Sequence, residues 1–110
     1  MSILQSILDA RELQTLEEEI AHYESVLSDY KIQLTEAPMD FVDSYDDEWA
    51  LFDEAGRRLQ IAKKALGLAN RLSKPEERAH HKKTVLGILN RIRALVNRLT
   101  RQLTQKIEEE

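Results

Sequence analysis

The sequence predicts an all-α protein, an elongated up-down-up bundle of three helices with coiled-coil-like packing. Three observations favour this fold class. Apolar residues recur at alternating spacings of three and four, as they do along the buried side of amphipathic helices. Only three glycines and two prolines, the residues that punctuate turns, occur among the 110 residues. Charged residues make up 33% of the chain, above the ordinary share of about 25%.

The first helix is expected over about residues 3–35. Its apolar seam follows a heptad repeat, with Leu or Ile at each a position and Leu or Tyr at each d position. The seam consists of Leu13, Leu16, Ile20, Tyr23, Leu27, Tyr30 and Leu34. Pro38 ends the helix, because the residue before a proline avoids the helical conformation. Residues 36–44 then form an acidic connector that carries aromatic side chains.

The second helix is expected over about residues 45–72. Asp46, Asp47 and Glu48 fall in its first turn, where the helix dipole favours negative charge. Its seam is Tyr45, Phe52, Leu59 and Leu66 at a, with Ala55, Ala62 and Ala69 at d. Because alanine is small, this seam predicts that a neighbouring backbone comes close.

The third helix is expected over about residues 75–108. Ser73 and Glu76 have the spacing of a capping box, and Pro75 stands in the first turn, where its missing N–H costs nothing. The turn before it is therefore very short, which makes the second and third helices antiparallel neighbours. Its seam is Val85, Leu89, Ile92, Val96, Leu99 and Leu103.

Three glycines, Gly56, Gly67 and Gly87, fall inside the expected helices. Each costs a helix up to about 1 kcal/mol relative to alanine. We interpret them as points of close packing or kinking.

Charge is sorted along the chain. Residues 1–55 contain fifteen acidic and two basic residues, a net charge of −13, whereas residues 56–110 contain fourteen basic and five acidic residues, a net charge of +9. Such polarity either closes within the molecule, acidic helix against basic helix, or offers different faces to two partners.

No arrangement of residues indicates catalysis, and no catalytic, cofactor-binding or metal-ligating residues are expected. The chain has no cysteine, no phosphate-binding glycine loop and no HExxH motif. His80 and His81 follow Glu77 at the start of the third helix, but they lack the second Glu-x-x-His that a di-iron bundle requires. The N-terminal residues lack the pattern of a signal peptide, and no stretch approaches the roughly 20 apolar residues of a membrane span. The expectation is a cytoplasmic protein that is not an enzyme and does not contact a membrane.

The first functional hypothesis is a single helical domain over residues 1–110 that serves as a protein–protein interaction module: an adaptor, a regulator or an assembly subunit. Ile61 and Leu68 stand one heptad apart at c positions of the second helix, outside its seam. Two apolar residues in register on the surface predict self-association, with a homodimer as the expected form.

Two alternatives concern charge. The third helix carries a basic face composed of Arg78, Lys82, Lys83, Arg91, Arg98 and Arg101. It suits nucleic-acid phosphates, an acidic protein partner or plain solvation, and the overall acidity and the lack of neighbouring aromatics argue against nucleic acid. Arg93, at an e position, is better placed than these residues to pair with glutamates of the first helix.

The second alternative is an acidic inhibitor that docks on a basic site of a partner through residues 36–54. Its candidate docking residues are Asp43, Asp46, Asp47, Glu48 and Trp49. The competing interpretation is a helix start with dipole-favoured acids and inward aromatics, which the heptad spacing favours.

Overall fold

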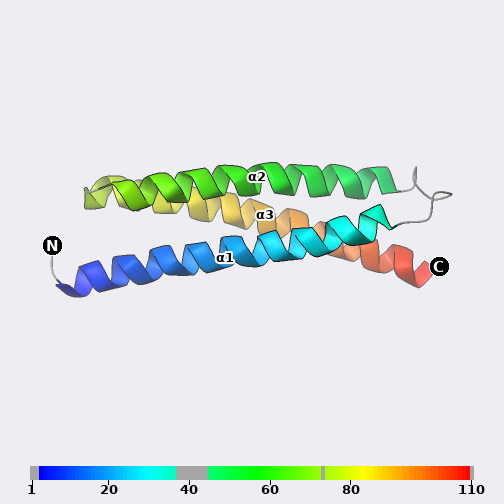
Figure 1. The fold of residues 1–110 in the computed structure, drawn as a ribbon, viewed down its shortest axis with the longest axis horizontal. Coiled ribbons are helices and arrows are strands. Elements are labelled where there is room, and N and C mark those ends of the chain that lie inside the picture. Colours follow the sequence, from blue (N-terminus) through cyan, green and yellow to red (C-terminus); the bar gives the residue numbers. More distant parts are fainter. Residues whose placement is uncertain (1–2, 37–44, 73, 110) are drawn as a thin grey trace.

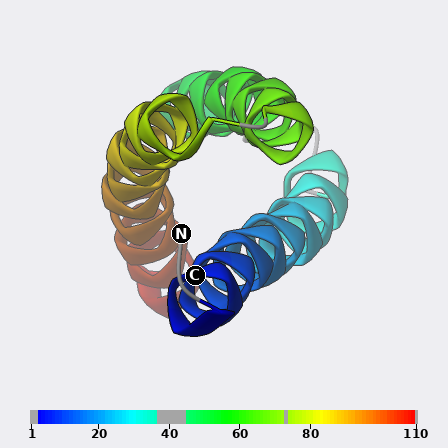
Figure 2. The same cartoon turned by 90° about the vertical axis from the view of Figure 1, so that its left-hand side faces the viewer.

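A computed structural model describes residues 3–36, 45–72 and 74–109 of the chain. It contains helices α1 (Ile3–Thr35), α2 (Asp46–Arg71) and α3 (Pro75–Glu109), whose bounds lie within one residue of those expected. The helices run side by side along a rod of 60 × 19 × 17 Å (Figure 1). Seen along the rod, they surround a common axis (Figure 2). This is the all-α three-helix bundle that the sequence predicts.

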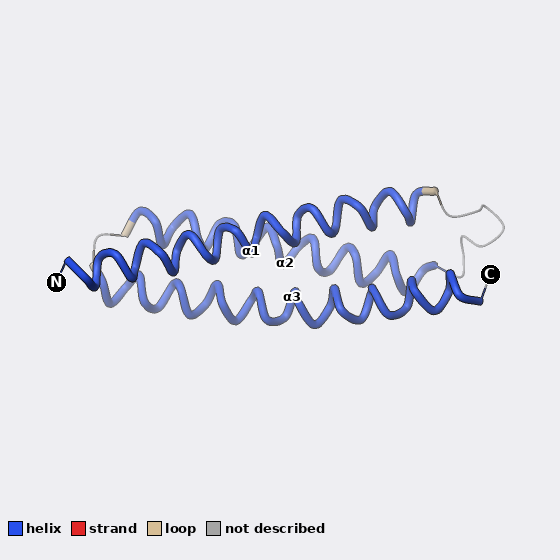
Figure 3. The backbone as a smooth tube through the Cα atoms, turned by 90° about the horizontal axis from the view of Figure 1, so that it is seen from below, coloured by secondary structure: helices blue, strands red, loops and turns tan. Residues whose placement is uncertain are grey.

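The helices alternate in direction, so the start of α1 and the end of α3 lie at opposite ends of the rod (Figure 3). Between α2 and α3, the backbone N–H of Leu72 donates to the carbonyl of Ala69 at 3.3 Å, and Pro75 is the first residue of α3. The position of Pro75 in the first turn of α3 is the one expected from the sequence, and so is the short connection between α2 and α3. Ser73, the expected cap, lies outside the described residues.

The expected seams of α1 and α3 form the core. In α3, Val85, Leu89, Ile92 and Leu99 are 0% exposed. Other seam residues are buried as well: Leu16, Ile20, Tyr23, Leu27 and Leu34 in α1, and Val96 and Leu103 in α3. Burial of apolar surface of this kind is the dominant favourable term in folding.

The pairing of α2 with α3 is closer than the contact of either helix with α1. Ala55, Ala62 and Ala69 of α2 are each 0% exposed, because their small side chains let the α3 backbone approach. By contrast, α1 reaches α3 through long side chains. The Tyr30 hydroxyl forms a hydrogen bond with the Thr100 hydroxyl, and Arg93 donates to the Tyr23 hydroxyl at 3.1 Å. The bundle is therefore a tight α2–α3 hairpin with α1 laid along it.

The interpretation of the glycines as close-packing points is wrong. A β-carbon built on Gly56, Gly67 or Gly87 meets nothing within 4 Å beyond its own helix. These positions are open because they lie off the seam, so no neighbour requires the absence of a side chain.

Substituting Gly87 by alanine is therefore expected to stabilise the protein by about 0.5–1 kcal/mol, since alanine loses less backbone entropy on entering a helix. Urea denaturation measures the change. Ala94→Gly, at another exposed site of α3, is the matched reverse substitution and should destabilise by a similar amount. A lower stability of Gly87→Ala would show that the site is crowded after all.

Candidate functional site

The sorted charges meet across the helices. Within the described part of the chain, every ion pair joins an acid from residues 1–55 to a base from residues 56–110. Lys63 of α2 lies 2.7 Å from Glu24 of α1, and Arg93 of α3 lies 2.5 Å from Glu19. The expectation that Arg93 pairs with glutamates of the first helix is confirmed. Acids of the first half of the chain and bases of the second half are thus paired with one another within the molecule.

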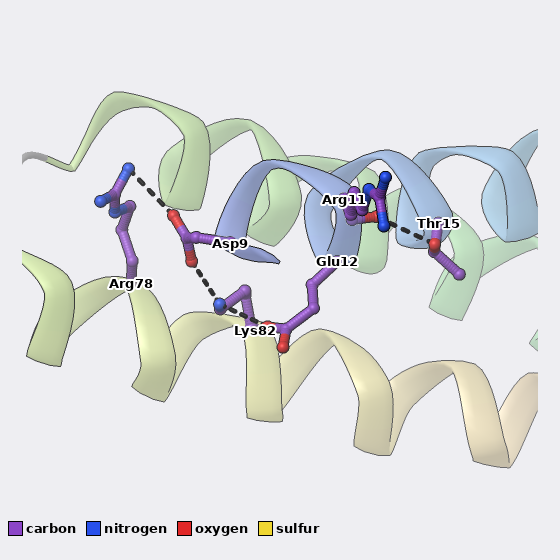
Figure 4. Close-up of polar contacts among 6 residues, drawn as sticks. All are labelled: Asp9, Arg11, Glu12, Thr15, Arg78 and Lys82. Carbon is purple, nitrogen blue, oxygen red and sulfur yellow. Dashed lines mark hydrogen bonds and ion pairs between the residues drawn. The ribbon is translucent and has the colours of Figure 1, made fainter. Parts of the chain in front are cut away.

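A charged layer occupies seam positions at the end of the rod where α1 begins (Figure 4). Asp9 of α1 is only 8% exposed and binds two bases of α3. Arg78 lies 3.2 Å from one of its oxygens, and Lys82 forms an ion pair with the other. Lys82 also lies 2.6 Å from Glu12. The heptad frame extends to Asp9, Arg78 and Lys82, so charge replaces leucine in this layer.

The pKa of Lys82 reflects this environment. Burial alone lowers the pKa, but the hydrogen bonds and charges of Asp9 and Glu12 outweigh burial and raise it above the ordinary value. Lys82 is therefore protonated and positively charged at neutral pH, and its charge holds α3 against α1.

A second charged pair lies near the opposite end. Glu48 is 2% exposed, and its carboxylate accepts a hydrogen bond from Lys106 at 3.0 Å. The Lys106 ammonium also lies 4.4 Å from the centre of the Tyr45 ring, within the range of a cation–π contact. This pair was not expected from the sequence, although Glu48 stands at a d position one heptad before Ala55.

The described candidate residues of the acidic docking segment do not all lie on the surface. Asp46 and Asp47 are exposed in the first turn of α2, as expected, whereas Glu48 is buried and belongs to the core. Trp49 is half-buried and packs edge-on against Phe52, with ring centres 5.7 Å apart. Asp43 lies outside the described residues. The burial of Glu48 follows from its seam position, which turns it toward Lys106.

The predicted basic face of α3 is divided. Arg78 and Lys82 are held by Asp9 and do not present a free surface. The remaining four members are exposed, and the described residues give none of them an ion pair: Lys83, Arg91, Arg98 and Arg101.

Ile61 and Leu68 are 55% and 52% exposed on the outer side of α2. Exposed bases stand beside them at heptad spacing, at Arg57, Lys64 and Arg71. This row of bases was not among the candidate sites expected from the sequence, although the interval of seven residues between its members could have indicated it. We define the α2/α3 outer face as the following exposed residues: Arg57, Ile61, Lys64, Leu68, Arg71, Arg91 and Arg98.

A separate hollow of about 710 Å³ lies between α1 and α3 and is lined in part by Leu8, Leu16 and Leu86. Its charged rim includes both Lys83 and Glu19, so no single charge dominates it. The described residues contain no group of three side chains arranged to hold a metal ion. His81 Nδ1 lies 3.0 Å from the Glu77 carbonyl of its own helix.

No helix in the described part of the chain is long and apolar enough to cross a membrane. Comparison with protein-family models, with curated proteins and with solved structures finds no match to the chain.

Replacing Lys82 by methionine is expected to lower the free energy of unfolding at neutral pH by about 1–3 kcal/mol, because a nearly buried carboxylate loses a charged partner. Lys83→Met, at the neighbouring exposed residue, is the matched control and should leave stability unchanged. Chemical denaturation of both variants checks the difference. Equal effects would show that the layer at Asp9 contributes nothing specific.

The same pair of proteins tests the pH dependence. Because folding raises the pKa of Lys82, its contribution is fully present below the ordinary pKa of 10.5 and is lost as the pH rises through the raised value. The gap in melting temperature between the unmodified protein and Lys82→Met should therefore stay constant up to about pH 9 and narrow in stronger alkali. A gap that is unchanged in alkali contradicts the assignment.

Lys106→Met is expected to destabilise the protein by about 1–3 kcal/mol, since it leaves the carboxylate of Glu48 buried without its cation. Arg101→Met, one and a half turns away and exposed, is the control with no expected effect. Thermal unfolding followed by circular dichroism measures both. A variant as stable as the control would mean that water takes the place of the lysine.

Proposed function

We propose that this protein is a non-enzymatic helical module for protein–protein interaction. One observation carries the proposal: Ile61 and Leu68 remain more than half exposed, in register, on a helix whose seam is already buried against its neighbours. Side chains of this size gain stability when they leave water, by about 25 cal/mol for each Å² of apolar surface covered. The bundle itself does not cover them.

The buried ionisable groups support a structural rather than a chemical use of charge. Asp9 and Glu48, the two buried acids of the described residues, both bind bases of α3. Each such pair joins α3 to a neighbouring helix near one end of the bundle, Asp9 from α1 and Glu48 from α2. The surface that remains for function is the exposed one, and among the described residues Ile61 and Leu68 of α2 are two exposed apolar residues one heptad apart.

A photo-crosslinking phenylalanine analogue placed at Leu68 tests the proposal in cells that naturally make the protein. We expect protein adducts on irradiation, and we expect their loss when Ile61→Glu is added. The matched control carries the analogue at Ile32, an exposed residue of α1 whose exposure of 54% is close to the 52% of Leu68.

An adduct at twice the mass of the chain identifies a second copy, which is the homodimer expected from the sequence, and any other protein adduct identifies a different partner. Both support an interaction module. Absence of adducts at position 68, or equal adducts at positions 68 and 32, would contradict it.

A further inference from the structure

The part of the α2–α3 hairpin that follows Glu54 carries a large excess of positive charge. From Ala55 to Ile107 the only acids are Glu76 and Glu77, near the turn. Six of the hairpin's bases are held in ion pairs by acids that precede Ala55: Arg58, Lys63, Arg78, Lys82, Arg93 and Lys106. The other eight are exposed, and the described residues give them no ion pair: Arg57, Lys64, Arg71, Lys74, Lys83, Arg91, Arg98 and Arg101.

Most of these eight bases lie on the side of the hairpin turned away from α1. The heptad frame puts Arg57, Lys64 and Arg71 at f positions of α2, and Arg91 and Arg98 at c positions of α3. Because the two helices are antiparallel neighbours, the two rows run along the same face.

Ile61 and Leu68, at c positions of α2, lie beside the row of Arg57, Lys64 and Arg71 and on the side of α2 that faces α3. The half-buried Ala65 of α2 and Ile88 of α3 line the contact between the helices beside them. The α2/α3 outer face is therefore an apolar strip with a basic row along its α2 side. Arg91 and Arg98 lie on its α3 side, at the end farther from the hairpin turn.

The opposite side of the hairpin shows what such a strip binds. There α1, an acidic amphipathic helix, lays Ile20, Leu27 and other seam residues against α2 and α3. Its flanking Glu24 binds Lys63 of α2, and its Glu19 binds Arg93 of α3. The outer face has a similar pattern, an apolar centre with bases beside it on α2 and α3, and no helix of the described residues lies on it.

From this repetition we infer that the α2/α3 outer face binds an acidic amphipathic helix of another protein, an inference that rests on the proposed interaction function. The basic row from Arg57 to Arg71 extends over about 21 Å of helix, so the partner segment spans about four turns. Glu54, bound by Arg58 at 3.1 Å, marks the end of the face farther from the hairpin turn.

Two other occupants fit less well. A second copy paired about a two-fold axis would place the row of Arg57, Lys64 and Arg71 against its own counterpart, where like charges repel. Nucleic acid would use the bases but not Ile61 and Leu68, and its phosphates have no need of an apolar centre.

To test this inference, the 110-residue chain is titrated with a labelled helical peptide of about four turns, with leucine at a and d and glutamate at the flanking positions. We expect saturable binding that weakens with added salt, and little binding of the same peptide with lysine in place of glutamate. Ile61→Glu, and separately the double variant Arg57→Glu with Lys64→Glu, should each weaken binding by about tenfold or more. Circular dichroism confirms that the variants remain helical.

The matched controls are Ile32→Glu and the double variant Arg11→Glu with Lys31→Glu, at exposed sites of α1, and neither should change the affinity. The inference is overturned if the acidic peptide fails to bind, if the lysine peptide binds as well, or if the α1 variants weaken binding equally. It is also overturned if a DNA or RNA duplex displaces the peptide and depends on the same bases but not on Ile61, or if sedimentation shows a dimer that Ile61→Glu abolishes. Adducts from position 68 without peptide binding would refute the acidic helix while leaving the interaction function in place.

Discussion

The burial of the α3 seam is the interaction on which the rest of the bundle depends. Val85, Leu89, Ile92 and Leu99 are completely covered, and they are covered by two different helices at once. Alanines of α2 approach from one side, and the leucines and tyrosines of α1 approach from the other. Without α3, α2 would lose its closest neighbour and α1 and α2 would have only each other to pack against, and helices with few tertiary contacts are marginal in water.

A repeating apolar seam does not by itself fix how the helices are aligned. Displacing α1 by one heptad along α3 would again set leucine against leucine. It would also separate Asp9 from Lys82 and leave both without their partners in a largely buried layer. Breaking a buried ion pair is costly because the remaining charge stays desolvated. The pair of Glu48 with Lys106 acts in the same way on α2 and α3 at the other end. Charge at the two ends thus selects one register from several that the core allows.

The exposed ion pairs have a different consequence. The side chains of Lys63 and Glu24 are 46% and 42% exposed, and pairs of this kind contribute little to stability. Their effect is on the surface that remains. Because the acids of α1 pair with bases on one side of the hairpin, the charge of the bases on the other side is not offset by α1, and the rod has two electrically different faces.

The sequence by itself determined the three helices, their bounds and their seams, because heptad spacing is a local property that repeats in every turn. It also determined that Arg93 would face the glutamates of α1. Only the tertiary structure decided the fate of individual charges. Arg78 and Lys82 belong to the same basic helix as Arg91 and Arg98, but the first two meet Asp9 whereas the last two remain exposed. From the sequence, Glu48 was expected to be one of several acids in the first turn of α2, and Gly87 was expected at a point of close packing. The structure buries Glu48 and leaves open space at Gly87. The environment of each of these residues depends on which side chains of a second helix lie next to it. The spacing of residues within one helix does not determine the distance to another helix.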